Sequence, residues 1–421
     1  MPHRDICLVF EQTITKELRI LTISAANGKL YAQSDVNDSK GFLFIEKEGK
    51  LRLGIFPGLD PKFGRTNLME ESRGALDHSV FTGNFSLTGD DPRDHMDELI
   101  MRLEELTSHK SSEVRGVSGS MQFIQDRTHY TNTSKSDVTQ ETWNAVLALR
   151  VYCGKTGTRP YTFTPGAAGG HEAMSAILKG RTLSKEHAEK ISDSGFADFL
   201  IGKALSVENG GRFLENFPMV FEGAAAAMVI RTIIESQMGF DKPSTHLETG
   251  PLSVTLKSEA EFDGVTCCGT YRYDDEGVLF SEGLHDIYSR TGAKEHKTQP
   301  TGNFRISPTE DNGRLVLPHV LCEPGAGFDL PRKHVLVKGI GAGGGGEQIT
   351  LGPAEAYVDG KAVSGFHLTT NARELLRNIT GIGDKSTIGC VKCFRGNNVF
   401  GCDISPSILF KPFSLTAGYI R

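Results

Sequence analysis

Short apolar runs broken by turn residues are the feature of this sequence that most restricts its fold. ICLVF, LRILTIS and KLRLGIF stand near the start, and PLSVTLK, HVLVKGIG and ILFKPFSLTAG follow after residue 250. Runs of this length, separated by glycine, asparagine and aspartate, are typical of strands. The 48 glycines among 421 residues fit many tight turns. The sequence therefore predicts sheets rather than a helical bundle.

Four segments instead show the three- and four-residue spacing of helices. The clearest follows the capping residues Asp91 and Pro92 and extends to about residue 109. Its apolar residues repeat on one face: Met96, Leu99, Ile100, Leu103 and Leu106. Further helices are expected at 183–205, 222–236 and 371–379.

These elements are expected to form two domains. The run ENGG at 208–211 interrupts the helical pattern and marks a boundary. We expect an N-terminal mixed α/β domain at 1–212 and a mostly β domain at 213–421, the second with a barrel-like sheet. The predicted fold class is α+β.

Charge and hydropathy limit the partners of the chain. It has 46 Lys and Arg against 52 Asp and Glu, a formal net charge of −6. Nucleic acids and anionic membranes require concentrated positive charge, so neither is expected as a partner. No apolar stretch approaches the roughly 18 residues of a membrane span, and the N-terminus carries charges where a signal peptide is apolar. A cytoplasmic protein is expected, with its eight cysteines as thiols.

A glycine-rich stretch, GIGAGGGGEQ at 339–348, superficially resembles a phosphate loop. Such a loop continues with Lys and then Ser or Thr at the start of a helix. Here Glu347 and Gln348 follow, and the next segment has a strand pattern. A mobile loop between two strands is the favoured interpretation.

The cysteines do not form a recognisable zinc motif. Cys390 and Cys393 make a C-x-x-C with Cys402 nearby, but a structural zinc site needs four ligands, usually as two such pairs. The other close pair, Cys267 and Cys268, is adjacent and awkward for one tetrahedral ion. Small apolar residues of a β-core are the favoured interpretation.

Three consecutive acids in YRYDDEG could belong to a binding site. Adjacent carboxylates repel one another when buried, so in isolation this run predicts a solvated turn. The later TGNFR offers Asn303 and Arg305, which can hold a carboxylate or an amide.

Several segments, taken in chain order, resemble the TldD/PmbA family. The stretch from GTYRYDDEG to TGNFR is similar to a family region that begins with DDEG and ends in TGN-x-R. LCEPG follows, and AEAYVDGKAVSGFHLTTNARELLRNITGIGD resembles a C-terminal segment whose helix is characteristic of the PmbA branch, also called TldE. The closing SPSILFKPFSLTAG is similar to the final strands of the family. The resemblance covers roughly residues 140–421.

The stretch GGHEAMSAILKG resembles the start of a zinc-peptidase helix at His171 and Glu172. Two ligands on one helix face must be one turn apart, but Ser175 and Ala176 stand at those positions. In the TldD branch, HExxxH lies on the Ala-rich helix before DDEG; here that helix, 222–236, contains no histidine. We therefore expect no metal or other cofactor, and an ordinary helix-start or loop role for His171.

The resemblance implies a TldE-like member of a peptidase family that lacks the zinc ligands. Such a subunit pairs with a second copy or with a zinc-bearing TldD-like protein, and helps to shape a cleft for a peptide or a small amide. The residues expected to line this cleft are Asp274, Asp275, Glu276, Asn303 and Arg305.

Two alternatives stay open, so the sequence does not decide whether the chain is an enzyme. One is a hydrolase or biosynthetic enzyme that acts on an amide through an unconventional site. Its candidate residues are His171, Glu172 and Cys393. The other alternative is a peptide-binding module without chemistry.

The helix at 222–236 supplies a physical argument for a dimer. Its residues are apolar on nearly every side, from the run of alanines to the isoleucines near its end. Such a helix is either enclosed within one domain or buried between two bodies. Pairing is expected to involve this helix or the C-terminal sheet.

Overall fold

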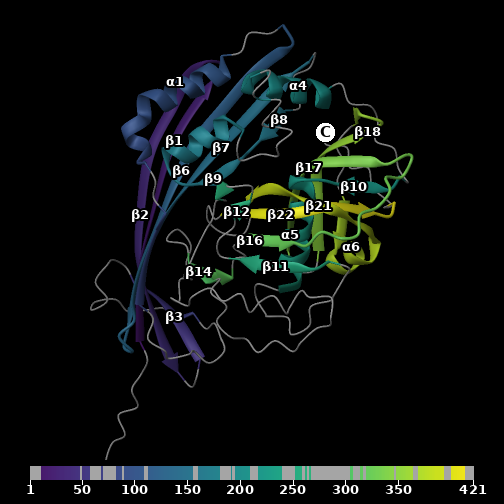
Figure 1. Cartoon of the computed structure of the whole chain (residues 1–421). Coiled ribbons are helices and arrows are strands. Elements are labelled where there is room, and N and C mark those ends of the chain that lie inside the picture. The colour runs from purple at the N-terminus through teal and green to yellow at the C-terminus, as the bar shows by residue number, and fades with distance from the viewer. Residues whose placement is uncertain are drawn as a thin grey trace, which may run out of the picture.

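A computed structural model shows, in the part of the chain that it describes, two nine-stranded sheets with helices packed on them, and two small two-stranded sheets (Figure 1). Among the residues that it describes, no helix is both long and apolar enough to cross a membrane. The described residues are 11–47, 50–56, 68–69, 82–87, 90–108, 112–154, 160–180, 191, 195–208, 217–238, 252–257, 261–262, 265–266, 304–306, 313–315, 319–345, 348–363, 368–392 and 400–412.

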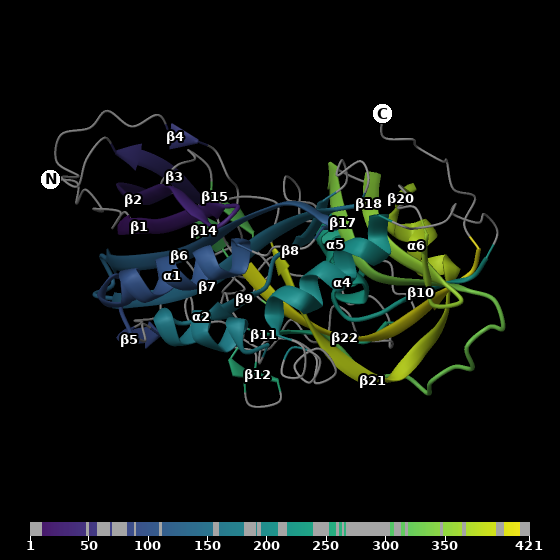
Figure 2. The ribbon, with the colours of Figure 1, turned by 90° about the horizontal axis from the view of Figure 1, so that it is seen from above.

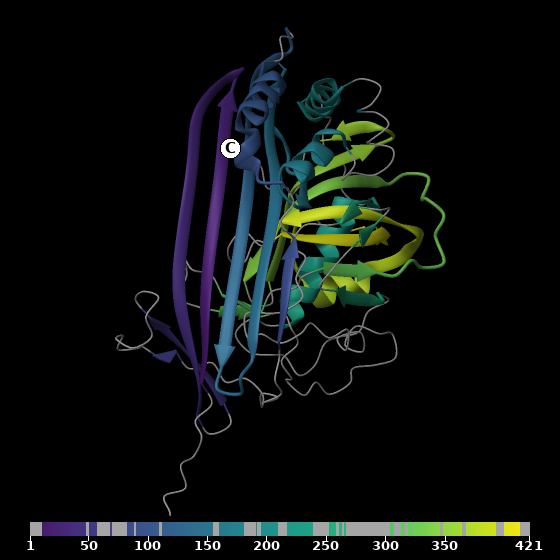
Figure 3. The same cartoon turned by 60° about the vertical axis from the view of Figure 1, so that its left-hand side comes forward.

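The first sheet is built on four long antiparallel strands, β1, β2, β6 and β7, which lie side by side (Figure 3). The strand order is β4-β3-β2-β1-β6-β7-β5, and β8 and β9 pair with the same edge of β7 as β5. The strands are β1 Glu11–Ala26, β2 Lys29–Lys47, β3 Lys50–Phe56, β4 Leu68–Met69, β5 Thr82–Leu87, β6 Val114–Asn132, β7 Asp137–Cys153, β8 Pro160–Phe163 and β9 Gly166–Ala168.

A two-residue turn at Asn27 and Gly28 joins β1 to β2. Both residues have positive φ, 49° and 74°, the conformation whose twist matches that of a hairpin. The Asn27 side chain accepts a hydrogen bond from the Val117 N–H at 3.1 Å, and the Gly28 N–H donates to Thr107 Oγ1 at 3.2 Å. The turn therefore ties the end of α1 to the sheet.

Three helices, α1, α2 and α4, pack on one face of the first sheet (Figure 2). Residues two apart in β7 face them, as the alternation of a strand requires: Trp143, Ala145, Leu147, Leu149 and Val151. Gly119 of β6 permits this close approach, because a Cβ there would lie 2.5 Å from Leu149 and 3.1 Å from Leu103. The helical elements of this half are η1 Pro92–His95, α1 Met96–Thr107, α2 His171–Leu178 and α4 Phe196–Glu208.

The second sheet mixes parallel and antiparallel pairs in the order β11-β16-β22-β10-β17-β18-β19. Strand β20 pairs with β18 and β21 pairs with β22; β12–β13 and β14–β15 are separate hairpin pairs. The strands are β10 Met219–Phe221, β11 Val254–Lys257, β12 Glu261–Phe262, β13 Val265–Thr266, β14 Phe304–Ile306, β15 Gly313–Leu315, β16 His319–Cys322, β17 Val335–Gly345, β18 Gln348–Val358, β19 Lys361–Val363, β20 Leu368–Asn371, β21 Ile379–Lys392 and β22 Phe400–Phe410.

Helices α5 (Ala224–Met238) and α6 (Ala372–Asn378) complete the core of this half. The apolar residues of α5 from Ala225 to Ile234 are buried: those at 225, 226, 229, 230, 233 and 234 join the main cluster, and Ala227 and Met228 pack with Ile340. The helix is thus enclosed within its own chain. Its apolar surface therefore does not require a second body, and the sequence-based physical argument for a dimer loses this support.

One ion pair lies inside this apolar core. Arg231 of α5 donates from Nε and Nη2 to the two carboxylate oxygens of Asp403 in β22, both at 2.6 Å. The Val320 N–H of β16 donates to the same carboxylate at 2.9 Å. The side chains are only 2% and 1% exposed. A buried charge of this kind is tolerated only when it is paired and hydrogen-bonded, so the pair fixes α5 relative to both strands.

Helix α4 contacts both halves of the molecule. Its apolar residues belong to the core of the first sheet, including Phe199 and Leu200. The Lys203 ammonium lies 5.9 Å from the ring centre of Phe199 and 5.8 Å from that of Tyr357 in β18. A lysine between two rings supports the contact through cation–π attraction and its apolar stem.

The α+β fold class is confirmed, and the helices predicted after Asp91, at 222–236 and at 371–379 lie within two residues of their expected positions. The barrel-like sheet is not found among the described strands, because the path from β11 to β19 is open. The end strands, β11 and β19, have four and three residues and do not pair with each other. The boundary at 212 lies outside the described residues and stays a prediction.

The glycine-rich stretch was wrongly expected to be a loop. Its residues up to Gly345 belong to β17, and Gly345 pairs with Gln348 across the hairpin. Register shifts at Val337/Gly339 and Ile340/Ala342 show that the strand is bulged there. Glycine at a bulge avoids the steric cost that a side chain would bring.

We predict that Asp403→Asn lowers the free energy of unfolding by about 3–5 kcal/mol, because it removes the negative charge that faces the buried Arg231 guanidinium. Urea unfolding of the full chain measures this. The double variant R231M/D403L should lose much less than the sum of the single changes. Arg102→Ala, which removes an exposed pair with Glu105, is the control and should cost below about 1 kcal/mol. If the loss of stability in the double variant equalled the sum of the losses in the two single variants, Arg231 and Asp403 would not interact and the ion pair would be disproved.

Candidate functional site

Helix α2 begins at His171 because the chain leaves β9 through two glycines. Gly169 has φ 115°, a conformation that favours glycine, and a Cβ there would lie 2.3 Å from the Glu172 carboxylate. Gly170 occupies the N-cap position and has no side chain with which to cap the helix. Glu172 supplies the acceptor instead, since its Oε1 accepts from the Gly170 N–H at 3.1 Å. A carboxylate in the first turn also suits the positive end of the helix dipole.

The segment before η1 is tied to this helix start through Asp90. The His171 N–H donates to the Asp90 backbone oxygen at 3.0 Å, and the Asp90 N–H donates to Glu172 Oε2 at 2.9 Å. Glu172 thus joins two segments that are far apart in the sequence. Glu172 therefore has a structural role at the junction of η1 and α2.

A capped turn places His95 at the other side of the junction. Asp91 Oδ1 accepts from the Arg93 N–H at 2.9 Å, and Pro92 is buried in the first turn of η1. Hydrogen bonds from the Arg93 side chain hold the pKa of the Asp91 carboxyl below its usual range. The stabilisation from Asp91 is therefore present above the ordinary aspartate pKa and is lost as pH falls through the lower folded value.

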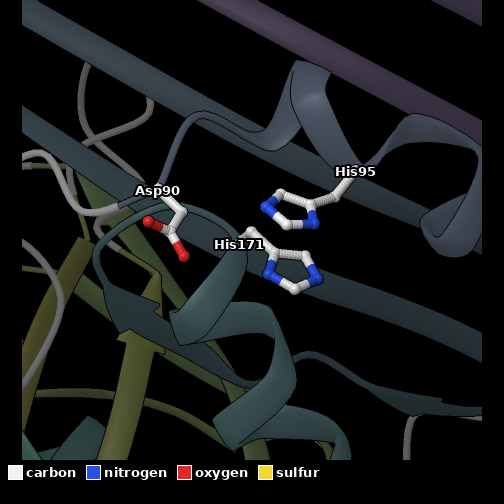
Figure 4. A group of neighbouring side chains, drawn as sticks. All are labelled: Asp90, His95 and His171. Carbon is white, nitrogen blue, oxygen red and sulfur yellow. The ribbon is translucent and has the colours of Figure 1, made fainter.

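Two imidazoles and a carboxylate meet at this junction. The rings of His95 and His171 are stacked, with centroids 3.7 Å apart and planes at 10° (Figure 4). One donor atom from each of Asp90, His95 and His171 lies within 4.8 Å of the others. Glu98 Oε2 is 3.4 Å from His171 Nε2. The group combines donors that bind divalent metals or exchange protons.

The structure describes two of the three residues named as catalytic candidates, His171 and Glu172, and places both at this junction. Cys393 lies outside the described residues. So do most of the expected cleft residues: Asp274, Asp275, Glu276 and Asn303. Arg305 lies in β14, in register with Arg314 of β15, and only its backbone position is described. The cleft itself therefore stays a prediction.

Sequence reasoning missed Asp90 and His95. Asp91 and Pro92 were recognised as a helix cap, but nothing in the local pattern connects DPRDH with the distant GGHEA. Pairing of β5 and β9 with the same edge of β7 brings the two segments together. The available signal was a histidine near the start of each of two helices.

Two segments that carry the family resemblance also contact each other. The Gly325 N–H of LCEPG donates to the Gly383 oxygen at 2.8 Å, and the Gly327 N–H donates to the Ile382 oxygen at 3.0 Å. A Cβ on Gly325 would lie 2.7 Å from both the Cβ and the backbone oxygen of Ile382. Glycine at this position therefore permits the close approach of the two backbones.

Comparison with known proteins gives matches in structure but not in sequence. No protein-family model and no curated protein matches the chain. A protein from Thermotoga maritima designated a modulator of DNA gyrase superposes with a TM-score of 0.60 at 14% identity, over 96% of this chain and 95% of that one. TldE from Thermococcus kodakarensis gives 0.58 at 15% identity, over 97% of each chain. A designated gyrase modulator from Bacteroides thetaiotaomicron gives 0.60 at 11% identity, over 97% and 95%.

The chain shares the fold of TldE. The resemblance to the TldD/PmbA family is confirmed at this level, and it extends to the N-terminal residues that had matched only in general character. At identities of 11–15% the likeness establishes the TldE fold, but a shared fold does not by itself give the activity of this chain.

We predict that Glu172→Ala lowers the free energy of unfolding by about 1–2 kcal/mol, because it removes the acceptor for two backbone N–H groups. Glu172→Gln should retain more stability, since its amide oxygen can still accept one of them. Glu105→Ala in α1 is the control, with an expected cost of about 0.2–0.5 kcal/mol from its exposed pair with Arg102. Urea unfolding compares the three; equal stability of Glu172→Ala and the wild type would contradict the capping role.

We predict that Gly325→Ala destabilises the TldE fold by about 1–3 kcal/mol, because the added methyl group overlaps Ile382. Gly202→Ala in α4 is a matched control, since no atom lies within 4 Å of the added Cβ. Alanine favours a helix over glycine, so this control should be stabilised by roughly 0.5–1 kcal/mol. Thermal unfolding measures both, and a neutral Gly325→Ala would disprove the close approach.

Proposed function

We propose that the chain is a TldE-like subunit of a peptide-processing assembly and that it does not itself carry the zinc site of the TldD branch. The fold likeness supports this proposal, since it extends over nearly the whole chain and over nearly the whole of TldE. The substrate class is an extended peptide or a small amide, and the expected compartment is the cytoplasm. Homodimerisation, or pairing with a zinc-bearing TldD-like protein, completes the proposed assembly.

The composition and packing of α5 carry the proposal. The family resemblance assigns the HExxxH motif of the TldD branch to the Ala-rich helix, and α5 is that helix here. Its residues from Ala225 to Ile230 are apolar and buried. Arg231 follows and is held by Asp403. This stretch offers no metal ligand, and a fixed guanidinium repels a cation placed beside it.

A second candidate function is a hydrolase with an unconventional site. The observation in its favour is the meeting of His171 with His95 and Asp90, because two imidazoles and a carboxylate can hold a metal or move a proton. The two candidates differ in what they need. The hydrolase acts alone and depends on His171, whereas the TldE-like subunit needs its partner for cleavage.

We predict that light scattering at micromolar concentration gives about twice the chain mass of 45.8 kDa, as a homodimer requires. A mass near 45.8 kDa would refute the homodimer. If addition of a TldD-like protein then gives a complex of about twice the chain mass, the heterodimer takes its place.

The same samples separate the two candidate functions. The subunit proposal expects negligible cleavage of an unstructured peptide by the chain alone and cleavage with the TldD-like protein added. Cleavage by the chain alone that is lost in His171→Ala would contradict that proposal and support the hydrolase. His129→Ala, an exposed histidine of β6, controls for the loss of an imidazole elsewhere.

A further inference from the structure

We propose that Asp90, His95 and His171 form a binding site for a divalent transition-metal ion of the zinc type, at the junction of η1 and α2. Among the described residues this is the one group of three side chains whose metal-binding atoms all lie within 4.8 Å of one another. The inference does not depend on the proposed function, because the junction lies on the first sheet and α5 lies on the second. It departs from the expectation of a chain without metal.

The backbone already holds the three donors close together. The His171 N–H bonds to the Asp90 oxygen, and the Asp90 N–H bonds to Glu172, so neither Cα can move far from the other. His95 ends a turn that Asp91 caps and that contains a buried proline. The ordering of these segments is therefore largely complete before an ion arrives, which favours binding.

Glu98 resembles the carboxylates that orient metal-binding histidines. Its Oε2 lies 3.4 Å from His171 Nε2, which leaves Nδ1 of the same ring available to an ion. Figure 4 shows one ring nitrogen of each histidine on the side of the Asp90 carboxylate. A second carboxylate on the outer nitrogen fixes the ring and raises the basicity of the inner one.

Metal binding must break the ring stack. The lone pair of an imidazole nitrogen lies in the ring plane, and the two planes are nearly parallel at 3.7 Å. A tetrahedral zinc ion with bonds of about 2.0–2.1 Å places two of its ligand atoms about 3.4 Å apart. The ligand atoms of Asp90, His95 and His171 lie within 4.8 Å of one another, so they must also move closer. At least one ring must therefore turn about its Cβ–Cγ bond before nitrogens of both rings can point to one ion. Asp90 is exposed, so the site is open to solvent.

The donors select the class of ion. Two imidazole nitrogens and one carboxylate oxygen suit Zn²⁺, Cu²⁺ or Ni²⁺, whereas Mg²⁺ and Ca²⁺ prefer oxygen ligands alone. Three protein ligands leave one tetrahedral position for water or for a further carboxylate. Cysteine thiolates elsewhere in the chain are the competing ligands for zinc, so a test must separate the two.

The test is calorimetric titration of the full chain with Zn²⁺ alone, after treatment with a chelator. We expect one equivalent to bind at this site, with at least tenfold weaker binding in His95→Ala and in His171→Ala. Glu98→Gln should weaken binding about 10- to 100-fold while keeping the stoichiometry, because it acts through His171. Mg²⁺ in excess should not compete.

His129→Ala is the matched control. His129 Nε2 also contacts a carboxylate, Asp137 Oδ1 at 2.9 Å, so the variant removes an exposed imidazole–carboxylate pair from another place on the sheet. It should bind zinc as the wild type does. An equal loss in this variant would show non-specific surface binding and overturn the proposal.

Two other results would overturn the site. One is the absence of zinc binding. The other is one equivalent of Zn²⁺ that still binds with unchanged affinity in both histidine variants, as ligation by cysteines would give. If His171→Ala fails to fold by circular dichroism, Asp90→Asn and His95→Asn decide the question, since the hydrogen bonds of Asp90 to α2 come from its backbone. None of these outcomes alters the mass measurement that tests the proposed function.

Discussion

The ion pair between Arg231 and Asp403 is the constraint on which the second half of the molecule depends. Its carboxylate also accepts from the Val320 N–H, so one side chain connects α5, β22 and β16. Strand β22 in turn pairs with β10, β16 and β21. Apolar packing can be satisfied by several similar arrangements, but a charge without its partner in such a core is costly. The pair therefore links the position of α5 to those of β22 and β16.

Local pattern was sufficient to predict the helices whose apolar residues repeat regularly, such as α1 and α5, and the strand-rich character of both halves. Local pattern failed where the structure of a segment depends on residues that are far away in the sequence. Nothing in the local pattern around Arg231 indicates its partner, because Asp403 lies 172 residues away. The glycines of β17 looked like a loop, because only their pairing with β18 shows that they belong to a strand.

The same distinction applies to the site at η1 and α2. The sequence indicated that His171 and Glu172 stand near a helix start, and the structure places them in the first turn of α2. It could not indicate Asp90 and His95, because strand pairing along β7 brings them to that turn. Family resemblance helped with the fold, since LCEPG and ITGIGD belong to segments that touch. It gave no information on a group formed outside the matched motifs.

The enclosure of α5 has an evolutionary consequence. A TldD-type motif on this helix needs two histidines and a glutamate, and the residues at 225–230 are small or apolar and fully packed. Each single replacement by histidine or glutamate would overfill the core or bury a polar or charged group, and both lower the stability of the fold. Placing such a motif on this helix would therefore require several replacements together with repacking of the core. The half-exposed junction at α2, by contrast, can accept or lose a ligand through single substitutions.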